Sequence, residues 1–390
     1  MKRKRNIYIM YAIALLQGMV FYGPIATLYR QAQGVSVLQI TIIESISLAL
    51  CLLLEFPWGV LADKIGYRKT MIICNLLYFI SKIVFWQASG FAMFLLERIL
   101  ISIVISGLSG VDTALLYLSC NQDDERKRES QQVFGVYNSL QEAGLLIAAF
   151  VFSVAVKDNY ELSALLTVVS YGIAALCSFG LVKVEGRRED SADIQEAFSF
   201  SGIFSFLRQT LKDKSLLLFL VGVALFNETH QIITVFLNQL QYVKCGLSDA
   251  AIGYIYILVT VAGLCGFLSS KLTARIGAAR TAAVLFAAAA MSCAVLAFTA
   301  NPLCSVLGML ILRVSFSLLQ PLQTEMQNRR ITTSNRATAL SINAVILDSV
   351  GIGTNLVFGA LAEYSLAGAL LLGVLLCVVG GVLYLRNASK

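Results

Sequence analysis

The segment from Gly59 to Lys69, GVLADKIGYRK, decides how the rest of this chain is interpreted. It is a short charged stretch in which one acid, Asp63, stands among clustered bases, and long apolar sequences lie on both sides of it. A charged turn between two apolar segments is typical of a loop that joins two membrane-spanning helices. The sequence therefore predicts an integral membrane protein.

The composition extends this prediction to the whole chain. Of 390 residues, 58% are hydrophobic and 14% are charged, with a mean hydropathy of +0.77, whereas soluble domains carry about 25% charged residues. A helix needs about 20 apolar residues to cross a bilayer. Long, uniformly apolar segments favour helices over barrel strands, which alternate in polarity. The predicted fold class is all-α, a polytopic membrane protein with twelve transmembrane helices at residues 7–29, 37–61, 70–90, 92–118, 132–156, 162–182, 215–239, 248–270, 281–300, 302–327, 337–361 and 365–385.

The basic residues between the spans predict the orientation. With a cytoplasmic N-terminus, the inner loops collect most of the Lys and Arg residues, and the outer loops keep Arg30, Lys157 and Lys244. Both termini are then cytoplasmic, and the net charge of +7 reflects this bias rather than a nucleic-acid partner. The start, MKRKR before an apolar run, is similar to a signal peptide, but a second span follows at once, which favours a retained first helix.

One long polar stretch divides the spans into six and six. It predicts a cytoplasmic linker at residues 184–214 between six-helix bundles at residues 1–183 and 215–390. The bundles are weakly similar: ADKIGYRK follows the second span and ARIGAART follows the eighth, and Gly66 aligns with Gly277 at an offset of 211. Transporters are often built from such repeats, with the substrate site between them.

These features together resemble the major facilitator superfamily of transporters. Its signature between helices two and three, Gly-x-x-x-Asp-x-x-Gly-x-Arg/Lys-Arg/Lys, is matched by Gly59, Asp63, Gly66, Arg68 and Lys69. The tripeptide Glu55-Phe56-Pro57 and the segment RATALS at 336–341 are also similar to family segments. The resemblance implies two six-helix pseudo-repeats, alternating access, a monomer and an inner or plasma membrane. It also implies a central cavity lined by helices one, four, seven and ten.

The resemblance assigns a conformational role to the signature. An acid is favoured at the N-terminus of a facing helix by the helix dipole and the free N–H groups there. In the family this latch is thought to close the cytoplasmic side against helix eleven, which here begins near residues 335–339. Arg68 is then expected to pair with Asp112 at the inner end of span four. The alternative is that these are ordinary solvated loop charges that set the topology.

Ionisable residues inside the spans point to chemistry, because they are costly in hydrocarbon unless they are paired or face water. Glu228 lies mid-span in LFNETHQ, where removal from water favours the protonated form of a carboxyl group, so Glu228 could bind and release a proton. Alternatively, Glu228 is permanently paired with Arg313 or another base. Further proton-coupling candidates are Glu142, Asp348 and Glu44, and the alternative role of Glu142 and Asp348 is hydrogen bonding between helices.

Polar residues on the cavity helices are candidates for substrate contact. His230, the only histidine, lies about 200° around the helix from Glu228, so the two cannot share one face. A lone histidine is more often a hydrogen-bonded packing residue. No function is assigned to Lys82. The cavity candidates are Gln17, Tyr22, Arg98, Asn227, His230, Gln231, Arg313 and Gln320.

Missing motifs argue against other chemistry. The nine cysteines show no CxxC spacing, and no phosphate-binding GxxxxGK(S/T), HExxH or GxSxG sequence occurs. No metal site, no cofactor and no enzyme activity are therefore expected.

The resulting functional prediction is a secondary active transporter that exports a small amphipathic molecule by proton antiport. Helix five, however, lacks the Gly-x-x-x-Gly-Pro run of many drug exporters. One alternative is uptake or exchange of a small organic anion held by Arg98 and Arg313. An alternative from another class is a protein that no longer transports and acts as a membrane receptor, a scaffold or a lipid-handling protein. The expected partners are a small-molecule substrate, protons or another coupling ion, and the lipid bilayer.

Overall fold

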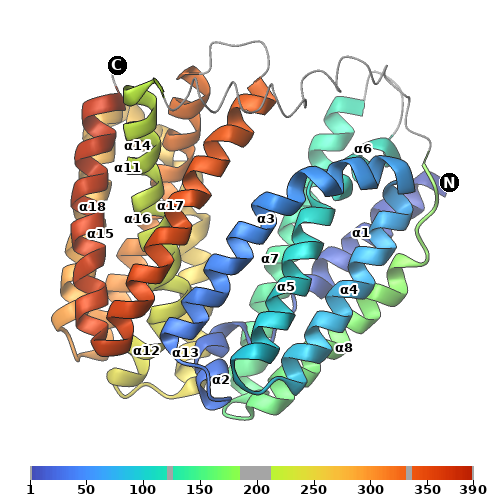
Figure 1. Cartoon of the computed structure of the whole chain (residues 1–390), viewed down its shortest axis with the longest axis horizontal. Helices are drawn as coiled ribbons and strands as arrows, with labels where there is room; N and C mark the ends of the chain where they lie inside the picture. The colour runs from blue at the N-terminus through green and yellow to red at the C-terminus, as the bar shows by residue number, and fades with distance from the viewer. Residues whose placement is uncertain (1, 121–125, 185–211, 331–335, 389–390) are drawn as a thin grey trace. The chain divides into compact units, whose positions relative to one another are not determined.

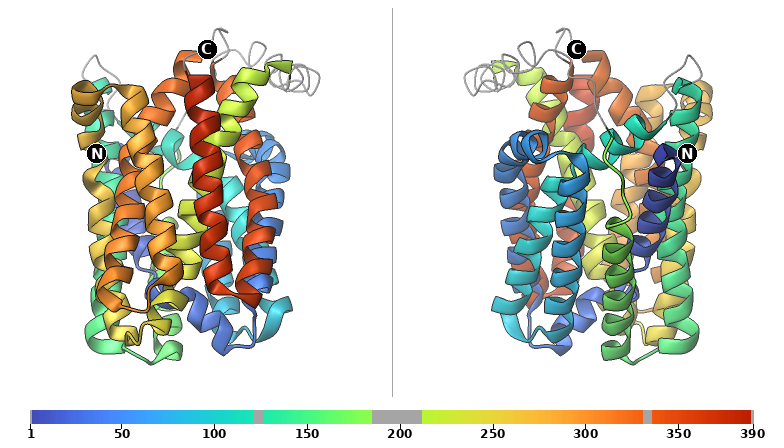
Figure 2. Two further views of the ribbon diagram at one scale, coloured as in Figure 1. Left: turned by 90° about the vertical axis from the view of Figure 1, so that its left-hand side faces the viewer. Right: turned by 90° about the vertical axis from the view of Figure 1, so that its right-hand side faces the viewer.

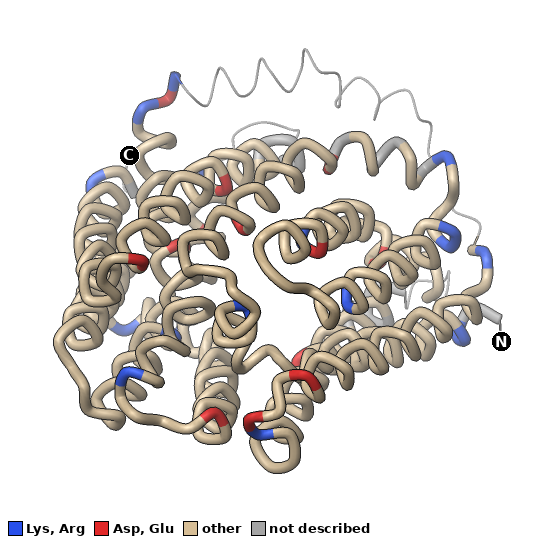
Figure 3. Tube along the Cα trace, turned by 60° about the horizontal axis from the view of Figure 1, so that its bottom comes forward, with Lys and Arg blue, Asp and Glu red and all other residues tan. Residues whose placement is uncertain are grey.

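Helices build all of the regular structure that can be described. The computed structural model describes residues 2–120, 126–184, 212–330 and 336–388, and no β-strand occurs among them. Twelve helical segments in these ranges are long and apolar enough to cross a membrane, which confirms the predicted fold class. Charged residues are sparse along the helices (Figure 3).

The first six spans contain the elements from α1 to α8 (Figure 1). These are α1 (Lys2–Gly18), η1 (Gly23–Ile25), α2 (Ala26–Ala32), α3 (Val37–Ile65), α4 (Tyr67–Gln87), α5 (Gly90–Leu108), α6 (Val111–Ser119), α7 (Arg126–Val151), the π-helix η2 (Phe152–Val156) and α8 (Tyr160–Ser178).

The last six spans contain the elements from α11 to α18. These are α11 (Lys214–Gln231), the π-helix η3 (Ile232–Leu237), α12 (Asn238–Lys244), α13 (Asp249–Ala262), the 3-10 helix η4 (Gly263–Leu268), α14 (Ser269–Ile276), α15 (Ala278–Phe298), α16 (Pro302–Arg330), α17 (Arg336–Tyr364) and α18 (Leu366–Ala388).

The described residues fall into two compact units. The first takes the described parts of Met1–Ser36, Ile46–Arg187 and Ser248–Ile257, and the second takes those of Val37–Ser45, Arg188–Leu247 and Leu258–Lys390. In the first unit, α4 packs against α5 and α8, and α1 packs against α7 and α8. In the second, α18 packs against α11 and α15, and α11 also packs against α17. Within each unit the long helices run roughly side by side (Figure 2).

Two glycines let α1 and α7 pack backbone against backbone. A Cβ atom added at Gly18 would overlap the carbonyl oxygen of Gln141, and one added at Gly144 would overlap that of Leu15. No side chain fits between the helices here, so the crossing requires glycine at both positions. It fixes the first and fifth spans against each other.

The two turns aligned in the sequence have nearly the same backbone conformation. Gly66 has φ 90° and ψ 142°, and Gly277 has φ 84° and ψ 152°, close to a region that essentially only glycine occupies. Each glycine precedes a helix of 21 residues, α4 or α15. Its carbonyl oxygen accepts hydrogen bonds from the amide and hydroxyl groups of a threonine, Thr70 or Thr281. The offset of 211 therefore relates backbone geometry and hydrogen bonds as well as residue types.

Candidate functional site

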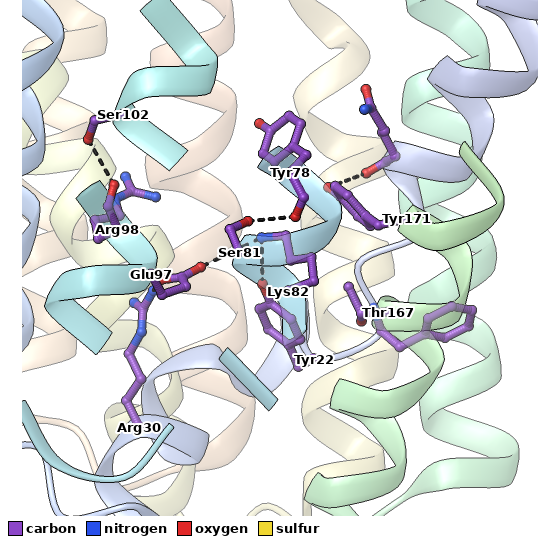
Figure 4. Close-up of polar contacts among 12 residues, drawn as sticks. Tyr22, Arg30, Tyr78, Ser81, Lys82, Glu97, Arg98, Ser102, Thr167 and Tyr171 are labelled. Atoms are coloured by element: carbon purple, nitrogen blue, oxygen red, sulfur yellow. Dashed lines mark hydrogen bonds and ion pairs between the residues drawn. The ribbon is translucent and has the colours of Figure 1, made fainter. Parts of the chain in front are cut away.

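A stripe of polar side chains runs along one face of α4 in the first unit. Asn75, Tyr78 and Lys82 follow one another at spacings of three and four residues, which places them on the same helical face. Asn75 and Lys82 are buried. A charged group this deep among apolar residues is costly unless its neighbours compensate the charge. The surroundings of Lys82 therefore define the first candidate site (Figure 4).

Lys82 is surrounded by tyrosine rings and one carboxylate. Its ammonium group donates a hydrogen bond of 2.9 Å to the hydroxyl of Tyr22 and lies 3.7 Å from Oε1 of Glu97. The same nitrogen lies 5.2 Å from the ring centre of Tyr171, 5.6 Å from that of Tyr22 and 5.7 Å from that of Tyr78. Aromatic faces attract cations, so these rings replace part of the hydration that Lys82 loses on burial.

Glu97 on α5 lies between two bases. Its second carboxylate oxygen is 3.9 Å from the guanidinium group of Arg30 on α2. Glu97 is 1% exposed, and neither of its oxygens accepts a hydrogen bond from a residue in the described ranges. We call Tyr22, Arg30, Lys82 and Glu97 the Lys82 cluster. In this cluster the single carboxylate of Glu97 faces both bases.

A second group of hydrogen bonds continues along the α4 stripe. Gln17 on α1 donates a bond of 2.8 Å to Oδ1 of Asn75, and its backbone carbonyl oxygen accepts one of 2.8 Å from the hydroxyl of Tyr171. The sequence predicts substrate contacts for Gln17 and Tyr22. The structure places both in hydrogen bonds inside the first unit, with Tyr22 buried, and their contact with a substrate stays a prediction.

In the second unit, Glu228 lies against the backbone of α17. A Cβ atom added at Gly351 would lie 2.8 Å from Oε1 and 3.2 Å from Oε2 of Glu228. The carboxyl group thus occupies the space that a side chain would take at this position. Asp348, one turn earlier on α17, interacts electrostatically with Glu228. Glu228 forms no ion pair with a described residue, so the alternative of a permanent pair with Arg313 is not seen.

His230 contacts α16 instead of α17. Its ring stacks on Phe316 with 3.8 Å between the ring centres and 6° between the planes. Its Nε2 atom lies 3.3 Å from the hydroxyl of Thr234 and 3.5 Å from Nη1 of Arg313. Glu228 and His230 therefore lie on different faces of α11, and Arg313 approaches the histidine.

Irregular helical turns accompany this second group. The π-helix η3 begins directly after Gln231, and single turns of π-helix are frequent at functional sites. The 3-10 helix η4 begins at Gly263, where an added Cβ atom would lie 2.6 Å from Nη2 of Arg313. The guanidinium group of Arg313 thus lies between His230 and the backbone of η4.

The remaining predicted residues differ in exposure. Glu44 is buried, Arg98, Asn227 and Asp348 are half-buried, and Glu142, Gln231 and Gln320 are exposed. The Oδ1 atom of Asn227, next to Glu228, is buried and accepts no hydrogen bond from a described residue. The described residues contain no group of three or more His, Cys, Asp or Glu side chains that could hold a metal ion.

The expected pair of Arg68 and Asp112 is not present. The Nε atom of Arg68 donates a hydrogen bond of 2.6 Å to the carbonyl oxygen of Leu181. Asp112 accepts one of 2.6 Å from the amide of Thr113 and one of 3.5 Å from the hydroxyl of Tyr137. The prediction of this pair is wrong for the conformation described, because Arg68 bonds to the backbone that follows α8 while Asp112 bonds to Thr113 and to Tyr137 on α7.

Only part of the expected latch can be assessed. The side chain of Asp63, the burial of Gly59 and the residues 331–335 before α17 lie outside what the structure describes. Gly66 has the positive φ angle that its turn requires, and Lys69 is exposed. The latch therefore stays a prediction.

Sequence reasoning missed the Lys82 cluster. It places Arg30 in an outer loop as a topology signal and gives Lys82 no partner, because the acid that faces both bases lies in a different span. The regular spacing of Asn75, Tyr78 and Lys82 along span three was the available signal. A polar stripe on an otherwise apolar helix indicates a polar partner inside the bundle.

Comparisons with known proteins bear on the whole chain. The model of the Major Facilitator Superfamily matches residues 7–355. A comparison with curated proteins finds no match.

Solved structures similar to this chain are membrane transporters of low sequence identity. The nucleoside transporter NupG is 15% identical with a TM-score of 0.79, covering 100% of this chain and 99% of NupG. A bacterial homologue of the human lysosomal transporter Spinster is 14% identical with a TM-score of 0.76, covering 100% and 97%. A D-xylose–proton symporter is 13% identical with a TM-score of 0.68, covering 97% of each chain. At these identities the likeness concerns the fold.

Proposed function

Since this chain belongs to the major facilitator superfamily and is a membrane transporter rather than an enzyme, we propose that it works by alternating access and exports a small amphipathic molecule in exchange for protons. Family membership argues against the alternative of a receptor, scaffold or lipid-handling protein that no longer transports. The similar structures are transporters of nucleosides and D-xylose. At 13–15% identity they do not indicate which substrate this chain transports. The proposal therefore rests on the residues of this chain.

The environment of Glu228 is the observation that carries proton coupling. An ionised carboxyl group in apolar surroundings is stabilised by a nearby base or by water. Glu228 has no base within ion-pair distance among the described residues, and Asp348 adds a second acid. Two neighbouring acids are stabilised when one of them is protonated. Glu228 is thus suited to hold a proton when it is shielded from water and to release the proton when water reaches it.

The surroundings of Arg313 favour a second candidate, transport of a small organic anion. Arg313 lies beside His230, and no acid of the described residues is within ion-pair distance of it. An anionic group of a substrate would be attracted to this positive charge, and guanidinium groups bind carboxylates with two hydrogen bonds. In this candidate Arg313 and Arg98 remain the proposed substrate contacts.

The distribution of basic residues supports the remaining features of the topology that we propose. Both termini would lie in the cytoplasm, the protein would reside in the plasma or inner membrane as a monomer, and Asp63 would form the latch. Lys64 and Lys69 beside this turn are exposed, as expected for residues that set the orientation.

The test is solute-dependent proton flux in proteoliposomes that contain the full-length protein. A pH dye in the lumen reports proton movement under an imposed gradient, with pools of candidate solutes, for wild type, Glu228→Gln and Glu325→Gln. Glu325 is the matched control, because it is an exposed acid paired with Arg329. We expect flux in the wild type and in Glu325→Gln, and its loss in Glu228→Gln.

Two outcomes would contradict this proposal. Unchanged flux in Glu228→Gln would remove Glu228 as the proton carrier and transfer the role to Asp348, Glu142 or Glu44. Exchange of an anionic solute without any proton flux would identify the anion transporter instead.

A further inference from the structure

A groove between α1 and the end of α8 has an apolar floor and a basic rim. Its volume is about 530 Å³, and it is lined by Lys4, Arg5, Tyr8, Ile9, Ala12 and Cys177. Both helices belong to the first unit and pack against each other. The groove takes no part in the proposed transport mechanism.

Hydrogen bonds hold the two walls of this groove together. Asn6 is fully buried, donates a bond of 2.9 Å to the carbonyl oxygen of Val182 and accepts one of 2.8 Å from the amide of the same residue. Gly180, two residues before Val182, lets the chain approach α1 closely. A Cβ atom added at Gly180 would lie 3.0 Å from Cδ1 of Ile9 and 3.5 Å from Nη2 of Arg5. The chain that leaves α8 is therefore fixed beside the first turns of α1.

Positive charge gathers at one end of the groove. Lys4 and Arg5 are exposed on its rim, and the exposed Lys183 follows Val182 directly. The sequence of α1 adds Lys2 and Arg3 and contains no acidic residue. None of the described residues that line this rim is acidic, so the rim is complementary to an anion.

The position of the groove indicates where that anion would come from. The first candidate membrane span starts at Lys4, so we expect the basic rim at the level of the lipid headgroups, with Ile9 and Ala12 further into the hydrocarbon. Tyr8 is 69% exposed, and tyrosine is enriched at the boundary between headgroups and hydrocarbon. Lys and Arg side chains near helix ends also extend toward the headgroups.

We propose that this groove is a binding site for an anionic phospholipid. Lys4 and Arg5 would hold the headgroup phosphate, with Lys183 next to them, and an acyl chain would lie along Ile9, Ala12 and Cys177. Basic pockets between transmembrane helices bind lipid headgroups in this manner. The apolar floor distinguishes this occupant from a free soluble anion, which would gain nothing from it.

The test measures lipid binding to the full-length protein in detergent by native mass spectrometry. Dioleoyl phosphatidylglycerol and dioleoyl phosphatidylcholine are titrated separately into wild type, Lys4→Gln/Arg5→Gln, Ala12→Phe and Lys271→Gln/Arg275→Gln. The last variant is the matched control, because it removes two exposed bases from α14. A thermal melt of each variant confirms that it is folded.

We expect the wild type to bind phosphatidylglycerol more tightly than phosphatidylcholine. Loss of two bases should weaken phosphatidylglycerol binding about 30-fold, which corresponds to about 1 kcal/mol for each basic side chain. Ala12→Phe should also weaken it, because the ring fills the floor without a change of charge, and the control should bind as the wild type does.

Three results would overturn the proposal. The first is equal binding of both lipids by the wild type. The second is an equal loss in the control and in Lys4→Gln/Arg5→Gln. The third is displacement of the lipid by millimolar inorganic phosphate, which would identify a soluble anion as the occupant.

Discussion

Removal of the carboxylate of Glu97 should destabilise the protein more than removal of the ammonium group of Lys82. In the Lys82 cluster one acid faces two bases at 3.7 and 3.9 Å. Glu97→Gln removes the acid that Arg30 and Lys82 share, and leaves Lys82 without an ion-pair partner among the described residues. Lys82→Met keeps the contact between Arg30 and Glu97. The double variant removes the acid together with the Lys82 cation that depends on it, so its stability should fall between those of the two single variants.

The magnitude follows from these distances and from the burial. At an effective dielectric constant of about 20, each attraction is about 4 kcal/mol, and Glu97→Gln removes both. The loss of one partner from a buried ion pair costs about 3–5 kcal/mol in net stability. Lys82→Met mainly loses the hydrogen bond from its charged ammonium group to Tyr22, about 1.5–3 kcal/mol. For a unit of this size, about 2–4 °C per kcal/mol predicts melting temperatures lower by about 6–20 °C for Glu97→Gln and about 3–12 °C for Lys82→Met.

Thermal unfolding of the detergent-purified variants, followed by fluorescence-detected size exclusion, measures this order. Glu325→Gln is the control, since it breaks an exposed ion pair with Arg329 that should contribute at most about 1 kcal/mol. The charge argument is refuted if Glu97→Gln melts no lower than this control. It is also refuted if adding Lys82→Met to Glu97→Gln lowers stability further instead of restoring part of it.

Two further predictions concern glycines that permit close contacts. Gly144→Ala should reduce the yield of folded protein on size exclusion, because the added methyl group overlaps the carbonyl oxygen of Leu15, at a cost of about 1–3 kcal/mol or more. The control is Gly135→Ala on the same helix, where an added Cβ atom has no atom within 4 Å and the yield should be normal. Equal yields of the two variants would contradict the close crossing of α1 and α7. Gly351→Ala should lower proton flux in proteoliposomes several-fold at near-normal yield, because its methyl group would displace the flexible carboxyl end of Glu228. Unchanged flux would show that proton coupling does not need the contact between Glu228 and Gly351.

The spans could be predicted from the sequence because their signals are local. A run of apolar residues between basic flanks identifies a span without knowledge of its neighbours. The third span, predicted at 70–90, is found at Tyr67–Gln87, and the fourth, predicted at 92–118, is found at Gly90–Ser119. The aligned turns at Gly66 and Gly277 could also be found from local sequence, because a backbone with a positive φ angle favours glycine at that position.

The contacts of the charged residues could not be predicted, because packing between spans determines them. The sequence shows that Glu228 is an acid inside a span, but only the fold shows that Gly351 makes room for its carboxyl group. It likewise suggests Arg313 as a partner of Glu228, whereas the rotation of α11 turns His230 toward that arginine. The sequence thus identifies the ionisable residues within the spans, while the partner of each depends on helix rotation.

The turns at Gly66 and Gly277 have a consequence for exchanges between the two halves. The 211-residue spacing holds from Ala62 and Thr273, whose carbonyl oxygens accept the glycine amides, to Ala88 and Thr299 at the ends of the following helices. Over this stretch neither half has an extra residue, so the two segments differ only in their side chains. One segment carries Asp63 and the other carries alanine at the matching position. The two turns therefore share a backbone conformation but not a charge, and exchanging them should leave folding intact while it moves the acid to the opposite half.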